Sequence, residues 1–269
     1  MITIPIDPII VSFGHLALRW YSLIILAAVF VGLRVVLREA SRKGFNRESI
    51  YDMVPWLILG GILGARLFHV LDHWQDTFAA NPWRVLNVWE GGLAIWGAVA
   101  GGLITLAILA WRRKWKLAFL LDLFAPALVL GQAVGRLACI ITGDAVGKPT
   151  NGPFGFAYVS PNAMVPELGV YYTPTPVYEF LLNMGIFAVL WRLRKKNLPD
   201  GALFFIYLSL YSVGRFFISI WSSYQTFALG LNQAQFFSLV ALVVSIPILI
   251  RMMITRQNVA LQFGTPQRK

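Results

Sequence analysis

The sequence predicts an all-α protein that crosses a membrane several times, and three observations support this fold class. Hydrophobic residues make up 58% of the 269 residues and charged residues only 13%, a balance that is not typical of soluble domains. Apolar stretches of about 18 to 25 residues, long enough to cross roughly 30 Å of hydrocarbon, recur along the chain. Backbone groups in lipid must be hydrogen-bonded internally, so these stretches are expected to be helices.

We expect seven spanning helices in one multi-pass bundle. Their expected ranges are 14–37, 51–72, 91–111, 117–141, 174–191, 201–222 and 232–250. We predict a single membrane domain over residues 1–254 and a polar cytoplasmic tail over residues 255–269. The longest connection, residues 142–173, is rich in proline, glycine and aromatic residues, which favours an ordered periplasmic cap.

The basic residues predict the orientation of the helices. Sixteen lysines and arginines fall beside the connections on one side of the membrane or in the tail, whereas the opposite connections hold only Arg84 and Lys148. Because cytoplasmic loops carry the excess of basic residues, the N-terminus is expected outside and the C-terminus in the cytoplasm. Anionic headgroups then account for the net charge of +11, and no nucleic-acid partner is expected. The segment 1–12 lacks the basic start of a signal peptide, so we expect the first span to be retained.

Few residues are suited to metal or cofactor chemistry. Cys139 is the single cysteine, and the three histidines, His15, His69 and His73, form no zinc motif. His69 and His73 share a helix face at i, i+4 spacing, but a pair of histidines near a membrane interface is more typical of a structural role. We expect no metal and no organic cofactor.

Four arginines fall near the outer ends of four different predicted helices, and they are the main functional signal. They are Arg19, Arg66, Arg136 and Arg215. A charged side chain at the bilayer centre costs about 2.5 kcal/mol or more, although each arginine could instead extend its charged end to the interface. Glu179 at a similar depth, and Glu90 just before the third helix, favour an interior polar cluster that binds an anionic ligand.

Glycines stand beside several of these arginines, and they allow two interpretations. Gly135 precedes Arg136 and Gly214 precedes Arg215, while Gly60, Gly61 and Gly64 precede Arg66. Small residues let membrane helices approach closely, which favours tight helix packing. The same glycines would also leave space for a lipid headgroup beside the arginines.

Five segments, taken in order and at their spacing, carry a family resemblance. They are Ile6-Asp7-Pro8 to Arg19-Trp20-Tyr21, Trp89-Glu90-Gly91-Gly92, Gly131-Gln132-Ala133-Val134-Gly135-Arg136-Leu137, Pro174-Thr175-Pro176-Val177-Tyr178-Glu179 and Gly214-Arg215-Phe216. Together they resemble the prolipoprotein diacylglyceryl transferase family over nearly the whole chain.

The resemblance implies a bacterial inner-membrane enzyme. Such an enzyme moves the diacylglyceryl group of phosphatidylglycerol onto the lipobox cysteine of a prolipoprotein, forms a thioether and releases glycerol 1-phosphate. Its implied partners are phosphatidylglycerol, the prolipoprotein signal peptide and membrane lipids.

We expect catalytic roles for Arg136, Arg215 and Glu179, although pairing with an arginine would weaken Glu179 as a base. The expected substrate-binding residues are Tyr21, Arg66, Arg19, Gly92, Gly135 and Asp144. Tyr21 could equally belong to an interfacial aromatic belt, and Cys139 is expected to be a structural thiol.

Several polar positions depart from the family pattern. At these positions the family usually has histidine or asparagine, or an acidic residue after the last arginine, and this chain has other residue types. The altered positions are Trp96, Cys139, Thr142, Thr173 and Ser219.

Two hypotheses about function therefore stay open: an active, divergent transferase, or a related protein that binds phospholipid or transfers a different group. A solute transporter is less favoured, because the polar residues lie near one interface rather than at the membrane midplane.

Overall fold

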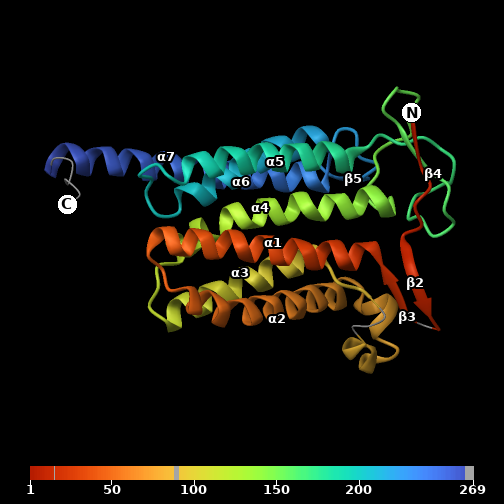
Figure 1. Cartoon of the computed structure of the whole chain (residues 1–269), viewed down its shortest axis with the longest axis horizontal. Helices are drawn as coiled ribbons and strands as arrows, with labels where there is room; N and C mark the ends of the chain where they lie inside the picture. Colours follow the sequence, from red (N-terminus) through yellow and green to blue (C-terminus); the bar gives the residue numbers. More distant parts are fainter. Residues whose placement is uncertain (15, 88–90, 264–269) are drawn as a thin grey trace. The chain divides into compact units, whose positions relative to one another are not determined.

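The computed structural model describes residues 1–14, 16–87 and 91–263, and long helices dominate it (Figure 1). The helices are α1 (Trp20–Lys43), α2 (Arg47–Asp72), α3 (Ile95–Arg112), α4 (Leu117–Thr142), α5 (Thr175–Leu193), α6 (Ala202–Ile218) and α7 (Gln233–Phe263). Seven helices in this part of the chain are long and apolar enough to cross a membrane. The predicted multi-pass helical fold is confirmed, while the predicted orientation of the termini stays a prediction.

The chain divides into two units, which we describe separately. The smaller unit is Leu37–Leu121, and the larger unit combines Met1–Val36 with Asp122–Lys269. The smaller unit contains α2, α3 and two short helical turns between them, η1 (Trp74–Phe78) and η2 (Pro82–Leu86).

Glycines bring α2 and α3 together in the smaller unit. A Cβ atom placed on Gly64 of α2 would lie 2.3 Å from the carbonyl oxygen of Gly97 on α3. A Cβ atom on Gly101 of α3 would lie 2.2 Å from the carbonyl oxygen of Gly60. Because no side chain fits at these distances, the backbones approach closely, and the packing interpretation of these glycines is confirmed.

The core of the larger unit lies among α4, α5 and α6. Its buried residues are Ala125, Val129, Ile186, Leu190, Leu203 and Tyr207. At the start of α6, the Asp122 carboxylate of α4 accepts hydrogen bonds from the backbone N–H groups of Gly201 and Phe204, each at 2.9 Å. Asp122 therefore satisfies N–H groups that the first turn of a helix leaves without a partner.

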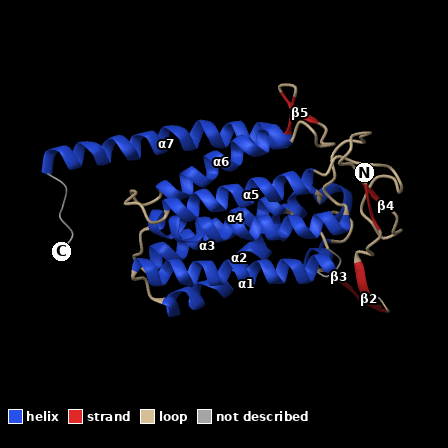
Figure 2. Cartoon of the chain, turned by 45° about the horizontal axis from the view of Figure 1, so that its top comes forward, coloured by secondary structure: helices blue, strands red, loops and turns tan. Residues whose placement is uncertain are grey.

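Residues 142–173 form an ordered cap in the larger unit. Strand β4 (Phe156–Tyr158) pairs in parallel with β1 (Ile2–Ile4), and Phe156 and Tyr172 exchange backbone hydrogen bonds of 2.9 and 2.8 Å. The Thr175 hydroxyl donates a hydrogen bond to the carbonyl oxygen of Ala145 at 2.6 Å. Figure 2 shows these short strands in red among the loops of the unit. The connection is thus hydrogen-bonded within the unit, while its role as a periplasmic cap stays a prediction.

The expected start of the first span was wrong, and the last helix is longer than the span expected within it. Residues before Trp20 form an antiparallel hairpin of β2 (Ile9–Phe13) and β3 (Leu16–Arg19), in which Arg19 pairs with Ile9. Arg19 therefore ends a strand instead of lying inside the first helix. At the other end of the chain, α7 continues beyond the expected limit at residue 250, as far as Phe263.

Candidate active site

Arg136, Glu179 and Arg215 meet in the larger unit. The Nη2 atom of Arg136 lies 2.6 Å from Glu179 Oε2, and Nη1 of Arg215 donates a hydrogen bond to Glu179 Oε1. The Glu179 side chain is only 2% exposed, whereas 24% of the Arg136 side chain and 13% of the Arg215 side chain are exposed. The carboxylate is therefore enclosed, while both arginine side chains keep accessible surface. We call these three residues the arginine–glutamate cluster.

The three side chains come from the same level of three helices. Arg136 lies six residues before the end of α4, Glu179 is the fifth residue of α5, and Arg215 lies three residues before the end of α6. At about 1.5 Å of rise per residue, each side chain lies within roughly 10 Å of its helix end. Two guanidinium groups and one carboxylate have a formal net charge of +1, so the cluster favours an anionic ligand.

Both arginines make a further contact beside Glu179. Nη2 of Arg215 donates to the Tyr224 hydroxyl at 3.1 Å, and the guanidinium carbon lies 5.5 Å from the centre of the Tyr224 ring. Nη1 of Arg136 lies 3.8 Å from the Cys139 sulfur, and Cys139 is buried. Each guanidinium group thus has a second contact besides Glu179.

The end of α4 continues into a second polar group. The Thr142 hydroxyl donates to Asp144 Oδ1 at 2.9 Å, and the Tyr158 hydroxyl donates to the carbonyl oxygen of Ile140 at 2.9 Å. Burial raises the pKa of Tyr158, and the nearby Asp144 carboxylate raises it further, so Tyr158 stays a neutral donor. Tyr21, at the start of α1, lies close enough to interact electrostatically with Asp144 and Arg136. The expected residues Tyr21 and Asp144 thus lie near the cluster.

Arg66 has a different environment, which we describe within the smaller unit. It is buried, and its five N–H groups match five hydrogen bonds to backbone carbonyl oxygens between α2 and α3. The acceptors are Val85 at 2.9 Å, Gly91 at 2.8 Å, Gly92 at 3.3 Å, Arg84 at 2.6 Å and Asn87 at 3.2 Å. Arg66 therefore holds this connection in place, and its expected role in substrate binding stays a prediction.

The two glycines named as binding residues differ in their surroundings. A Cβ atom on Gly92, which has φ +75°, would lie 2.4 Å from Nε2 of His69 and 2.9 Å from Nη1 of Arg66. A Cβ atom on Gly135 would meet only Cδ1 of Ile25, at 3.6 Å. Gly92 is therefore required by the fold, whereas no contact of an added Cβ atom requires Gly135.

Two other charged residues named from the sequence lie elsewhere. The side chain of Arg19 is exposed at the end of β3, and Glu90 lies outside the described residues.

Two of the altered family positions are occupied by buried hydroxyls with backbone partners. The Thr173 hydroxyl donates to the carbonyl oxygen of Lys148 at 3.1 Å, and the Ser219 hydroxyl donates to that of Phe216 at 2.8 Å. The Trp96 side chain, in the smaller unit, is exposed. Thr173 and Ser219 thus serve local structure and leave no unpaired hydroxyl at these positions.

Sequence reasoning missed three polar residues around the cluster. Tyr224 contacts Arg215 from the loop after α6, and nothing in the sequence marks it. Asn183 and Tyr211 could have been found, because each lies four residues, one helical turn, from a cluster residue on its own helix. Within the described part of the chain, no group of three or more histidine, cysteine or acidic side chains is arranged to hold a metal ion.

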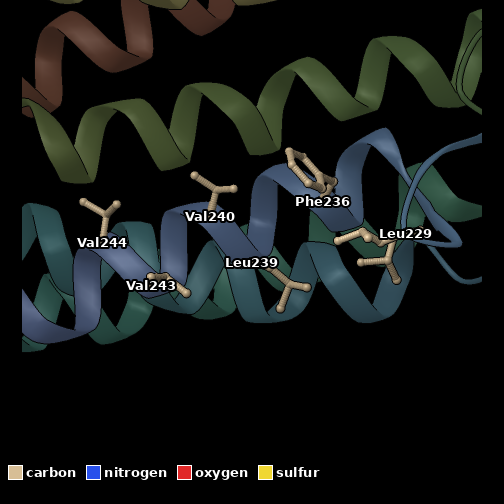
Figure 3. Close-up of a pocket in the computed structure, with 7 residues that line it drawn as sticks. Leu229, Phe236, Leu239, Val240, Val243 and Val244 are labelled. Carbon is tan, nitrogen blue, oxygen red and sulfur yellow. The ribbon is translucent and has the colours of Figure 1, made fainter.

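An open apolar groove of about 260 Å³ lies elsewhere in the larger unit, along α7 and the hairpin of β5 (Thr226–Ala228) and β6 (Leu231–Asn232). Figure 3 shows side chains that line it, and all of the lining residues are apolar. They are Leu229, Leu231, Phe236, Leu239, Val240, Val243 and Val244. Without a charged or hydrogen-bonding side chain, this groove does not supply the chemistry of an active site.

Comparison with known proteins relates the chain to a known family. The family model described as prolipoprotein diacylglyceryl transferase matches residues 8–251. Among curated proteins named phosphatidylglycerol–prolipoprotein diacylglyceryl transferase, that of Gloeobacter violaceus is 42% identical over 216 residues, covering 78% of this chain and 80% of the relative. The protein of that name from Listeria innocua is 34% identical over 259 residues, covering 91% of this chain and 90% of the relative. The chain therefore belongs to the prolipoprotein diacylglyceryl transferase family.

Proposed function

We propose that this protein transfers the diacylglyceryl group of phosphatidylglycerol to the lipobox cysteine of prolipoproteins in the bacterial inner membrane. The cysteine sulfur attacks the glycerol carbon that carries the phosphate ester, so a C–S bond forms and a C–O bond breaks. The bonding electrons leave with glycerol 1-phosphate, and the thiol proton is released. The observation that carries this proposal is the pair of partly exposed arginine side chains held on one buried carboxylate.

Arg136 and Arg215 are proposed to bind the phosphate that becomes part of the leaving group. A guanidinium group presents a planar set of donors that matches phosphate oxygens, and it stays charged in a site of low dielectric constant. Charge develops on the departing oxygen in the transition state, and fixed positive groups beside that oxygen lower the barrier. The same groups would favour the thiolate form of the attacking cysteine.

Glu179 is proposed to hold the two arginines at a fixed separation. Each of its oxygens lies against one guanidinium group, so both oxygens are engaged by the arginines. This arrangement supports a role in orienting the arginines over a role as the general base. Oriented donors cost no reorganisation at the moment of reaction.

The other expected binding residues have proposed places around the phosphate. Tyr21 and Asp144 lie near Arg136, and Gly135, where an added Cβ atom would meet only Cδ1 of Ile25 at 3.6 Å, is proposed to lie against the glycerol headgroup. The ordered cap, residues 142–173, would receive the lipobox peptide. With the N-terminus outside and the tail from residue 255 in the cytoplasm, as we propose, the cluster lies in the outer leaflet.

The proposed reaction can be tested on the purified protein in phosphatidylglycerol nanodiscs with a synthetic lipobox peptide. We expect the peptide to gain the mass of one diacylglyceryl group and an equal amount of glycerol 1-phosphate to appear. A peptide with serine in place of the lipobox cysteine is the matched control and should gain no mass. If phosphatidylglycerol binds and neither product forms, the transferase proposal fails and a lipid-binding function is the better account.

A further inference from the structure

One face of α5 carries unpaired polar atoms inside the larger unit. Among the described residues, the buried side-chain nitrogen and oxygen atoms without a hydrogen-bond partner are Oε2 of Glu179 and both polar atoms of Asn183. Glu179 is 2% exposed and Asn183 is 1% exposed. Glu179 Oε2 keeps its ion-pair contact with Arg136 but accepts no hydrogen bond of suitable geometry. Since buried polar groups are almost always hydrogen-bonded, this face requires a further partner.

The spacing of the two residues indicates what that partner is. Glu179 and Asn183 are four positions apart on α5, so they are neighbours on one helix face with Cβ atoms about 5 to 6 Å apart. The Asn183 amide is a donor, whereas Glu179 Oε2 only accepts. A water molecule between them would accept from Nδ2 and donate to Oε2, and buried waters typically make about three such bonds to otherwise unsatisfied groups.

The helices around Asn183 place it in a layer of uncharged polar groups. Gln132 of α4 lies one turn from Arg136, and Tyr211 of α6 lies one turn from Arg215, just as Asn183 lies one turn from Glu179. The Tyr207 hydroxyl donates to Oε1 of Gln132 at 3.0 Å. Further along the same helices, the apolar core begins with residues such as Val129 and Ile186. Packing alone favours an apolar residue at position 183, because a polar group within a membrane helix is energetically costly. Polar residues that do occur there usually have a function.

We propose that Asn183 is a positioning residue for the arginine–glutamate cluster. Through one buried water it holds the Glu179 carboxylate in the orientation in which each oxygen faces one arginine. The separation of the two guanidinium groups, and with it the phosphate site, depends on that orientation. The link to phosphate binding rests on the proposed function.

The substitution Asn183→Leu tests this role, because leucine has a similar size and makes no hydrogen bonds. Replacing an unpaired amide with an apolar group should leave the Tm unchanged or raise it. In the same variant, kcat/KM for phosphatidylglycerol should fall about tenfold to a hundredfold, the loss expected when a hydrogen bond to a charged group disappears, while KM for the peptide stays unchanged. Ser245→Ala is the matched control. Ser245 is fully buried, and its hydroxyl lies 2.9 Å from the Ser209 hydroxyl, with which it shares a hydrogen bond outside the cluster.

A Leu variant with the wild-type Tm and wild-type kcat/KM would overturn the proposal. If leucine prevents folding, the pair Asn183→Ser and Asn183→Ala decides, because the two residues differ by one hydroxyl that can bind the water. The serine variant should be the more active of the two, and equal activities would contradict the role. If the wild type transfers no diacylglyceryl group, the proposed function fails independently. Retention of phosphatidylglycerol in native mass spectrometry then decides: weaker retention by the Leu variant supports the role of Asn183, and equal retention refutes it.

Discussion

Arg136 Nη2 lies 2.6 Å from Oε2 of Glu179, whose side chain is only 2% exposed. The other oxygen of the same carboxylate accepts a hydrogen bond from Arg215. One buried anion thus joins two cations that come from different helices, α4 and α6. The pairing accounts for the stability of these charges inside a membrane, and it gives the two cations the fixed positions that the proposed phosphate site requires.

Removing the carboxylate should destabilise the protein. In Glu179→Ala the two guanidinium groups lose their common partner, and we expect the free energy of unfolding to fall by roughly 3 kcal/mol. This value is at the low end for breaking a buried ion pair, because both arginine side chains are partly exposed. Thermal unfolding in detergent measures this loss. Asp52→Asn is the control, since Asp52 pairs with Arg113 at 3.7 Å with both side chains exposed, and it should cost less than about 1 kcal/mol. Equal effects of the two substitutions would contradict the structural role of Glu179.

Arg66 should not tolerate lysine. A lysine has three N–H donors instead of five and no planar arrangement, so Arg66→Lys leaves at least two carbonyl oxygens of the connection between α2 and α3 without their partner. We expect a loss of about 2 kcal/mol or more and faster protease cleavage between the two helices. Arg113→Lys, at an exposed arginine, is the matched control. An Arg66→Lys protein as stable and as protease-resistant as the wild type would refute this assignment.

Two glycines should respond differently to alanine. Gly135→Ala adds a methyl group whose nearest neighbour is Ile25 at 3.6 Å, so the Tm should hold or rise slightly, while diacylglyceryl transfer slows because the headgroup space shrinks. Gly64→Ala instead places a methyl group 2.3 Å from the Gly97 carbonyl oxygen and should lower the Tm sharply. Parallel measurements of Tm and transfer rate separate the two effects. If Gly135→Ala transfers at the wild-type rate, the headgroup does not use this space.

The link between the N-terminal segment and the cap should depend on pH only in acid. The backbone N–H of Ile9 donates to the Asp7 carboxylate at 2.8 Å and the Asn162 amide donates to it at 2.9 Å, and these bonds lower the pKa of Asp7. A lowered pKa in the folded state means that the stabilisation is fully present above the ordinary carboxyl value of about 3.9 and is lost as the pH falls through the lowered value.

Hydrogen exchange at the Ile9 amide, corrected for the intrinsic pH dependence of exchange, tests this prediction. We expect constant protection between about pH 7 and pH 5 and a loss of protection below about pH 4. Asp7→Asn removes the titrating group and should make the protection independent of pH. A loss of protection in the wild type already between pH 7 and pH 5 would show that another group controls this link.

The sequence predicts the long helices well because hydropathy and length alone determine them. It also predicts that Arg136, Glu179 and Arg215 lie at one level, since the position of each within its span gives its depth. The start of the first helix is not predicted, because the apolar strand residues that end at Arg19 are continuous with the hydrophobic span. Hydropathy does not distinguish a short hairpin from the first turns of a helix.

The contacts of individual polar groups are harder to predict. An arginine that binds backbone carbonyl oxygens, such as Arg66, looks the same in the sequence as one that faces a ligand. Thr173 and Ser219 stand at two of the altered positions, yet both bond local carbonyl oxygens, and only the folded backbone reveals this. Asn183 is the exception, because its spacing from Glu179 is visible in the sequence.

The most direct test of the central claim compares diacylglyceryl transfer by the wild type, Arg136→Ala, Arg215→Ala and the control Arg113→Ala. Each protein is incubated with phosphatidylglycerol and a lipobox peptide, and the mass of the peptide is followed. We predict a diacylglyceryl adduct with the wild type and with Arg113→Ala, and none with either cluster variant, provided that all four proteins remain folded. An adduct that persists in folded Arg136→Ala or Arg215→Ala would show that the arginine–glutamate cluster does not carry the reaction.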